Sequence, residues 1–186
     1  MTTKSKYTPE NIESLESNQI FVFGSNLNGA HDGGAAYIAY KKFGARMGVG
    51  FGITGQCYAL PTLDKQMKRF DADDLEHGFI QLINTILWDD KNNEFLLTKV
   101  GCGIAGYSVD EVADALWSAV DKTQSDCAFE LRNLVLPKEF IRSKEEKARY
   151  DIWFQFRGVD KKDAELFQDS YREAESQYNS FLENEH

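Results

Sequence analysis

The sequence has little cysteine and no closely spaced cysteine pair. Its three cysteines, Cys57, Cys102 and Cys127, are an odd number in 186 residues and form no Cys-x-x-Cys motif. Disulfide frameworks and zinc ribbons both need paired cysteines. We therefore expect reduced thiols and no disulfide scaffold. We also expect no metal, because the sequence shows no other ligand spacing typical of a metal site.

Long apolar runs are missing as well. No run approaches the length of about 18 to 20 residues that spans a bilayer. Residues 1–6 also lack the apolar core of a signal peptide. We therefore expect a cytoplasmic protein with no membrane partner. The hydrophobic fraction of 42% and the charged fraction of 27% are ordinary for a soluble globular chain, and 186 residues suffice for one stable domain.

Positive charge is in deficit. The chain has 21 lysines and arginines against 30 aspartates and glutamates, a formal net charge of −9. Affinity for duplex nucleic acid comes mainly from lysine and arginine neutralising phosphates, so no duplex nucleic-acid partner is expected. An anionic ligand would have to be held by local backbone donors rather than by the overall field of the protein.

Glycine is abundant in two short segments, and these are the most informative feature of the chain. The first glycine loop, residues 23–34, reads Phe-Gly-Ser-Asn-Leu-Asn-Gly-Ala-His-Asp-Gly-Gly, and the second, residues 101–107, reads Gly-Cys-Gly-Ile-Ala-Gly-Tyr. Each follows an apolar run and precedes a helix-like stretch. Glycine lets backbone approach a ligand closely, and a helix start offers free N–H donors to an anion. Two such loops predict one shared ligand site.

Apolar runs alternate with helix-like stretches along most of the chain. Strands are expected where β-branched and aromatic residues cluster, and helices where apolar residues recur at helical spacing. The expected strands are residues 19–23, 57–60, 95–100 and 134–136. The expected helices are a short one beginning at Thr8-Pro9, then residues 35–43, 71–88 and 109–120. The glycine-rich stretch 48–55 is interpreted as a ligand-facing loop.

This alternation predicts an α/β sandwich with a largely parallel sheet covered by helices. The ligand is then expected at the carboxyl ends of the strands, where both glycine loops emerge. Residues 1–142 are expected to form the main domain. Residues 143–186 are charged, and a terminal helix over about residues 160–182 is interpreted as packed on that domain. The alternative is a helix for a partner or a dimer, and we expect a monomer or a weak dimer.

The second loop is spelled Gly-x-Gly-x-x-Gly, the fingerprint of dinucleotide-binding folds. A Rossmann-type NAD-dependent oxidoreductase would carry this loop after its first strand, with an acidic residue about 20 positions further on at the end of the second strand. Here the loop follows a later strand, and Asp121 and Asp126 lie on or just after a helix. The hydride-transfer interpretation is therefore the less favoured one. A second alternative is that the glycines serve only tight turns.

The ordered set of motifs resembles the macrodomain family. A strand ending in Phe-Gly-Ser-Asn26 is followed by Gly33-Gly34-Ala35-Ala36 at a helix start, Tyr58-Ala59-Leu60-Pro61, and the second glycine loop. The spelling is most similar to a divergent macrodomain-like group of bacterial and phage proteins, over roughly residues 19–140. This resemblance implies a three-layer α/β/α sandwich with a mixed, mostly parallel sheet, and a site for ADP-ribose, as in Appr-1"-p processing-like relatives.

The resemblance also implies roles for individual residues. It places Asn26 against the distal ribose, with Gly33 and Gly34 beside that ribose. An aromatic near adenine would correspond to Phe140, for which a plain core role is the alternative. Amides of the second glycine loop would wrap the diphosphate: Gly101, Gly103, Ile104, Ala105, Gly106 and Tyr107. Gly24, Ser25, Ala35 and Cys102 adjoin these residues and complete the expected ligand-binding set.

The first glycine loop also departs from the family pattern, because His31 and Asp32 lie inside it. Asp32 is a candidate for activating water or orienting a ribose hydroxyl, and His31 for acid or base catalysis together with Asn26. Both residues have the alternative of merely capping the loop. The paired glutamates of glycohydrolase-type relatives are absent, so cleavage of poly-ADP-ribose is not expected. Cys102 is interpreted as a small packed residue rather than a nucleophile.

The sequence thus predicts binding of ADP-ribose or a related NAD-derived nucleotide, free or attached to an ADP-ribosylated protein, with no further cofactor. Metal-independent hydrolysis of an ADP-ribosyl bond is a second step of this hypothesis. The alternative from another class is a non-catalytic module that sequesters a nucleotide signal.

Overall fold

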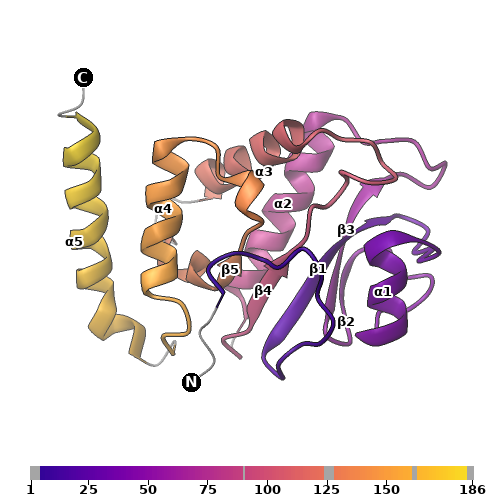
Figure 1. The fold of residues 1–186 in the computed structure, drawn as a ribbon, viewed down its shortest axis with the longest axis horizontal. Helices are drawn as coiled ribbons and strands as arrows, with labels where there is room; N and C mark the ends of the chain where they lie inside the picture. Colours follow the sequence, from indigo (N-terminus) through magenta and orange to yellow (C-terminus); the bar gives the residue numbers. More distant parts are fainter. Residues whose placement is uncertain (1–4, 90, 124–127, 161–162, 184–186) are drawn as a thin grey trace.

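A five-stranded sheet runs through the computed structural model, which describes residues 5–89, 91–123, 128–160 and 163–183 (Figure 1). Cys127, Asp126 and His186 lie outside these residues. The strands are β1 (Gln19–Asn26), β2 (Gly52–Thr54), β3 (Cys57–Leu63), β4 (Glu94–Leu97) and β5 (Leu134–Val135). Their order across the sheet is β2-β3-β1-β4-β5, and every pairing is parallel except the antiparallel one between β2 and β3.

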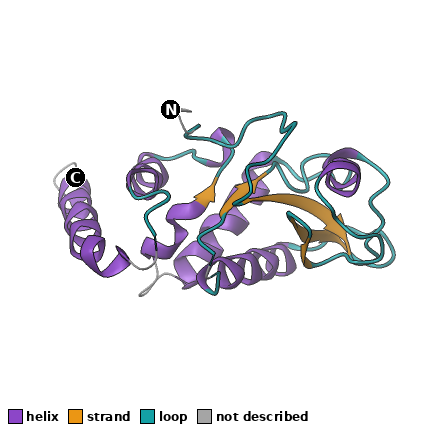
Figure 2. Cartoon of the chain, turned by 90° about the horizontal axis from the view of Figure 1, so that it is seen from below, coloured by secondary structure: helices purple, strands orange, loops and turns teal. Residues whose placement is uncertain are grey.

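Helices cover both faces of this sheet, so the expected three-layer α/β/α sandwich with a mixed, mostly parallel sheet is confirmed (Figure 2). Within the described residues the α-helices are α1 (Gly34–Lys42), α2 (Ala72–Leu87), α3 (Val109–Thr123), α4 (Lys144–Gln155) and α5 (Ala164–Glu183). Two short 3-10 helices, Ala128–Asn133 and Lys138–Phe140, flank β5. None of the described helices is both long and apolar enough to cross a membrane.

Burial of both faces of the central strand β1 accounts for the layers of helices on the two sides of the sheet. Successive side chains of a strand point to opposite faces, and both faces of β1 are apolar. Ile20 and Val22 pack in a cluster with residues of α2 and α3, whereas Phe21 and Phe23 pack with Ala36 and Ala39 of α1 and with neighbouring residues. The continuous apolar run of β1 is thus buried on both sides, as parallel sheets require.

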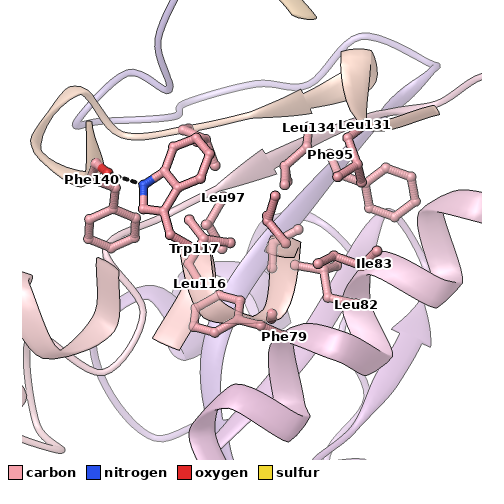
Figure 3. Packing of buried hydrophobic residues seen from close by; sticks show 14 of the residues in the cluster. Phe79, Leu82, Ile83, Phe95, Leu97, Leu116, Trp117, Leu131, Leu134 and Phe140 are labelled. Atoms are coloured by element: carbon pink, nitrogen blue, oxygen red, sulfur yellow. Dashed lines mark hydrogen bonds between the residues drawn. The ribbon is translucent and has the colours of Figure 1, made fainter. Parts of the chain in front are cut away.

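The larger core lies between the sheet and the α2–α3 pair (Figure 3). Phe79, Leu82 and Ile83 of α2 are buried at helical spacing and meet Phe95 and Leu97 of β4. The Trp117 indole of α3 donates a 2.7 Å hydrogen bond to the carbonyl of Phe140. This bond satisfies a buried polar group and ties the chain beyond β5 to α3.

The prediction of a helix beginning at Thr8 is wrong. Residues 5–18 contain no helix, because Thr8 makes different hydrogen bonds. Its hydroxyl donates to the carbonyl of Val135 at 2.8 Å and its amide to the carbonyl of Leu136 at 2.9 Å. A long-range anchor to β5 therefore replaces the local cap that the Thr-Pro pair suggests. The anchored segment lies beside that edge of the sheet.

The loop expected at residues 48–55 includes a strand. Ile53 pairs with Tyr58, so β2 is an antiparallel edge strand of the sheet. The backbone of Gly50 packs against the first glycine loop, since a Cβ on Gly50 would lie 2.1 Å from the carbonyl oxygen of Asn26. Glycine is used here for close backbone approach rather than for facing a ligand.

The C-terminal residues form two helices, and the first of them was not expected from the sequence. Ser143 and Glu146 make a reciprocal capping box at the start of α4, a motif that is readable from the sequence. Tyr150 and Trp153 of α4 are buried in the main core. The expected terminal helix is α5, and its Tyr171 packs against Phe156 with ring centroids 5.4 Å apart. Buried residues of α4 and Tyr171 of α5 therefore belong to the same core, and α5 lies beside α4 (Figure 1).

Candidate functional site

A cavity of about 300 Å³ lies between the two glycine loops, at the carboxyl ends of β1, β3 and β4. The first loop and the start of α1 form one wall, the second loop another, and residues at and beyond the end of β3 a third. Its lining residues are Gly24, Ser25, Asn26, Ala30, Asp32, Gly33, Gly34, Ala35, Ala36, Thr62, Leu63, Met67, Thr98, Lys99, Val100, Gly101, Gly103, Ile104 and Ala105.

The topology of the sheet creates this opening. From β1 the chain builds β2 and β3 on one side, and β4 and β5 on the other. Such a reversal leaves a crevice at the carboxyl ends of the strands, the usual ligand position in open α/β sheets. The two loops meet there closely, because a Cβ on Gly24 would lie 3.0 Å from the amide nitrogen of Gly101.

The second glycine loop carries backbone donors that have no partner within the described part of the chain, on residues that line the cavity. Tyr107 donates its amide to the carbonyl of Gly101 at 3.0 Å, which closes the loop at its base. Within the described part of the chain, the amides of Gly103, Ile104 and Ala105 have no hydrogen-bond partner. Gly103 and Ile104 are exposed to solvent, so these amides are available to an acceptor oxygen on a ligand.

The start of α1 adds donors from the opposite wall. Gly33 is the N-cap residue and has no side chain with which to cap the helix. The first helical bond runs from the amide of Tyr37 to the carbonyl of Gly33 at 3.2 Å. Amides of the first turn therefore lack helical partners, and Gly34, Ala35 and Ala36 line the cavity. A helix start in this position favours an anion.

The loops also touch through a side chain. Ile104 is 78% exposed at the tip of the second loop. Its Cδ1 lies only 3.3 Å from the place that a Cβ on Gly33 would occupy. A larger residue at position 33 would therefore intrude into the gap between the two loops.

One carboxylate and one amine line the cavity. Asp32 is exposed beside the start of α1. Lys99 forms ion pairs with Glu139 at 2.9 Å and with Glu10 at 3.2 Å, and the hydrogen bond that it donates to Glu139 is the main reason why the pKa of Lys99 is raised. The Lys99 ammonium is thus paired with two carboxylates that do not line the cavity.

Asn26 lines the cavity, but its side chain is engaged with the loop itself. Its amide nitrogen donates to the carbonyl of Ala30 at 2.9 Å and its oxygen accepts from the amide of Ala30 at 3.1 Å. This pair of bonds closes residues 26–30 into a turn. One N–H and one lone-pair site of the Asn26 amide remain for a ligand.

His31 does not line the cavity. It is 1% exposed, its Nε2 lies 3.1 Å from the carbonyl oxygen of Arg46, and its ring packs edge-on against Phe23. Because Nε2 faces a carbonyl, it bears the proton and donates. The structure thus places His31 as a link between the first loop and the residue 46–50 turn, apart from Asp32 in the cavity.

Four other expected site residues also lie outside the cavity lining: Cys102, Gly106, Tyr107 and Phe140. Tyr107 is buried, and its hydroxyl donates to the carbonyl of Phe70 at 2.7 Å. Phe140 is fully buried in the core, which matches the alternative weighed for it. Cys102 is half-buried, and burial is the first cause of its raised thiol pKa, so the structure gives no sign of an activated thiolate.

Several lining residues were not expected from the sequence. Thr62, Leu63, Thr98 and Lys99 sit at or just after the ends of β3 and β4, so the rule that sites gather at carboxyl ends would have found them. The position of Met67 could not be found by this rule, because Met67 lies beyond the end of β3. It reaches the cavity because Asp64 accepts hydrogen bonds from the amides of Gln66 and Lys68, which folds the chain back.

Comparison of the chain with protein families, curated proteins and solved structures gives no match. Among the described residues, no group of three or more histidines, cysteines, aspartates and glutamates is placed to hold a metal ion. The lining of the cavity supplies backbone amides and the Asp32 carboxylate, and these groups define the chemistry open to the site.

Proposed function

We propose that the protein binds ADP-ribose or a related NAD-derived nucleotide in the cavity between the two glycine loops. The observation that carries this proposal is the pair of opposed backbone donor sets, the free amides of residues 103–105 and the first turn of α1. Two donor sets facing one cavity suit a ligand with a diphosphate and adjacent hydroxyls. The ordered motifs that resemble macrodomains point to the same class.

The charge of the protein agrees with this assignment. At a net charge of −9 the protein does not attract anions as a whole. Amide dipoles supply the local compensation that a diphosphate needs, because the charge of Lys99 is already paired with Glu10 and Glu139. A Rossmann-type oxidoreductase is less well supported, because the Gly-x-Gly-x-x-Gly loop follows β4 and, among the described residues, β5 is the only strand after it.

Asp32 is the group best placed for a hydrolytic step. It is the carboxylate in the cavity lining, so it is available to orient or deprotonate a water that attacks an anomeric carbon. His31 has no part in this proposal, since it is buried away from the cavity. Phe140 cannot stack on adenine in this cavity, because it is fully buried in the core. Capture of the nucleotide without turnover is the second candidate function, and it needs only the backbone donors.

Calorimetry with ADP-ribose tests binding. Gly33→Val is the matched perturbation, because Gly33 has an extended backbone at φ −157° that valine tolerates. The valine would fill the gap beside Ile104. We expect wild-type binding and a large loss in the variant, with a decrease in stability of about 1 kcal/mol because valine is a poorer N-cap residue than glycine. Absence of binding by the wild type would refute both candidate functions.

A turnover assay on mono-ADP-ribosylated protein then separates the two candidates. Asp32→Asn keeps the shape of the side chain and removes its charge, so a hydrolase should retain binding and lose turnover. Asp73→Asn is the control, since Asp73 is also an exposed carboxylate at a helix start but lies outside the cavity lining. Binding without turnover by the wild type would identify a sequestering module.

A further inference from the structure

Residues 64–70, here called the clamp segment, connect β3 to α2 and pass beside the second glycine loop. Their fold is set locally: the Asp64 carboxylate accepts from the amides of Gln66 and Lys68, each at 2.8 Å. Met67 at the turn adopts φ 61° and lines the cavity. The segment therefore forms a cavity wall and is also in position to touch the second loop.

Arg69 contacts the second glycine loop in two ways and α3 in a third. Its guanidinium stacks on the Tyr107 ring, 3.8 Å from the centroid. One of its nitrogens donates to the carbonyl of Gly106 at 3.2 Å, and another forms a charge-assisted hydrogen bond with Glu111. Arg69 is absent from the cavity lining, so its donors are directed at the loop and α3 rather than at a ligand.

The groups that Arg69 holds are the base of the second loop. Tyr107 closes the loop through its amide bond to Gly101, and its hydroxyl donates to Phe70 of the clamp segment. The Tyr107 ring also packs on Gly101, where an added Cβ would lie 2.7 Å from Cδ2. One stacked pair of side chains thus fixes both ends of the loop, while the free amides lie between those ends.

Glu111 connects the same base to α3. It accepts from the amide of Ser108 at 2.8 Å while its own amide donates to the Ser108 hydroxyl at 3.2 Å, an arrangement that caps the helix. A planar guanidinium can stack on a ring and donate to two acceptors at once, whereas a lysine ammonium cannot reproduce this geometry. The role therefore depends on the shape of arginine and not only on its charge.

We infer that Arg69 is a positioning residue that holds the amides of the second glycine loop ready for an anionic ligand. The inference deepens the proposed function, on which its ligand-binding arm rests. Backbone donors bind a diphosphate well only when they are ordered in advance, because ordering them on binding lowers the affinity. Arg69 supplies that order from outside the cavity.

Three variants test this inference: Arg69→Ala, Arg69→Lys and, as matched control, Arg142→Ala. Arg142 also bonds acidic residues of α3, Asp110 and Asp114, but none of its contacts is with the second loop. Amide ¹⁵N NMR of the unliganded proteins reports the order of residues 103–105. We expect lower order parameters there in both Arg69 variants, with no change in Arg142→Ala. Unchanged order in Arg69→Ala would overturn the inference.

The second measurement is the affinity of each variant for ADP-ribose, determined by calorimetry. Both Arg69 variants should bind roughly tenfold more weakly, the equivalent of ordering one or two groups on binding. Arg142→Ala should bind as the wild type does. Rescue by Arg69→Lys in both arms would reduce the role to charge and also overturn the inference. If the wild type does not bind ADP-ribose, the proposed function fails while the NMR arm still decides the role of Arg69.

Discussion

Alanine at Gly101 and at Gly106 should destabilise the protein to clearly different extents. Both glycines have nearly the same left-handed backbone, with φ 74° and 73°. An L-residue in that region costs about 1–2 kcal/mol. At Gly106 nothing lies within 4 Å of an added Cβ, so Gly106→Ala should cost only this amount. At Gly101 the Cβ would meet the Tyr107 ring at 2.7 Å, and such overpacking adds roughly 1–3 kcal/mol.

Gly103→Ala is the baseline of this series. Gly103 lacks a left-handed backbone, and nothing lies within 4 Å of its added Cβ, so we expect a change within about 0.5 kcal/mol. The free energy of unfolding of each variant is measured by urea denaturation with fixed m-value. Equal losses for Gly101→Ala and Gly106→Ala would show that the Tyr107 ring does not pack on Gly101 and would refute the reasoning.

Three further predictions concern the scaffold. Hydrogen bonds from Lys122 and then Ser118 lower the pKa of Glu76, so this carboxylate stabilises the fold at neutral pH and that contribution is lost as the pH falls below its unfolded value of about 4.3. Glu76→Gln should therefore lower stability at pH 7 and flatten the acid limb of a stability–pH curve, and an unchanged curve would contradict this. Burial raises the pKa of the Cys57 thiol to about 12, so labelling of the native protein at pH 8, read by mass spectrometry, should leave Cys57 unmodified. Rapid modification would mean that the site opens locally. Ser143→Ala removes the cap of α4 and should lower the free energy of unfolding by about 1 kcal/mol in urea denaturation, with Ser170→Ala as an exposed serine control.

Much of the fold was predictable because its signals are local. The apolar runs of β1, β3 and β4 and the helical periodicity of α2 and α3 identify these elements within a few residues of their observed bounds. The parallel arrangement follows from their alternation. The capping box at Ser143 shows that α4 was also readable, although the charged composition of that stretch obscured it.

The parts of the fold that could not be predicted depend on contacts between distant residues. Thr8 does not start a helix, because its hydroxyl bonds to Val135, and β2 exists because Ile53 pairs with Tyr58. A local preference for a cap or a loop is worth about 1 kcal/mol or less. Burial and hydrogen bonding in the assembled sheet outweigh such preferences.

The sequence alone determined that two glycine loops follow β1 and β4, and parallel strands then placed both loops at one edge of the sheet. Only the tertiary structure decided which residues face the cavity between them. Neighbours in sequence diverge there, since Asp32 lines the cavity while His31 is buried against Phe23. The structure also brought Met67 into the cavity wall and Arg69 against Tyr107. Side-chain direction depends on how the loops pack, and loop packing has no periodicity in the sequence from which to read it.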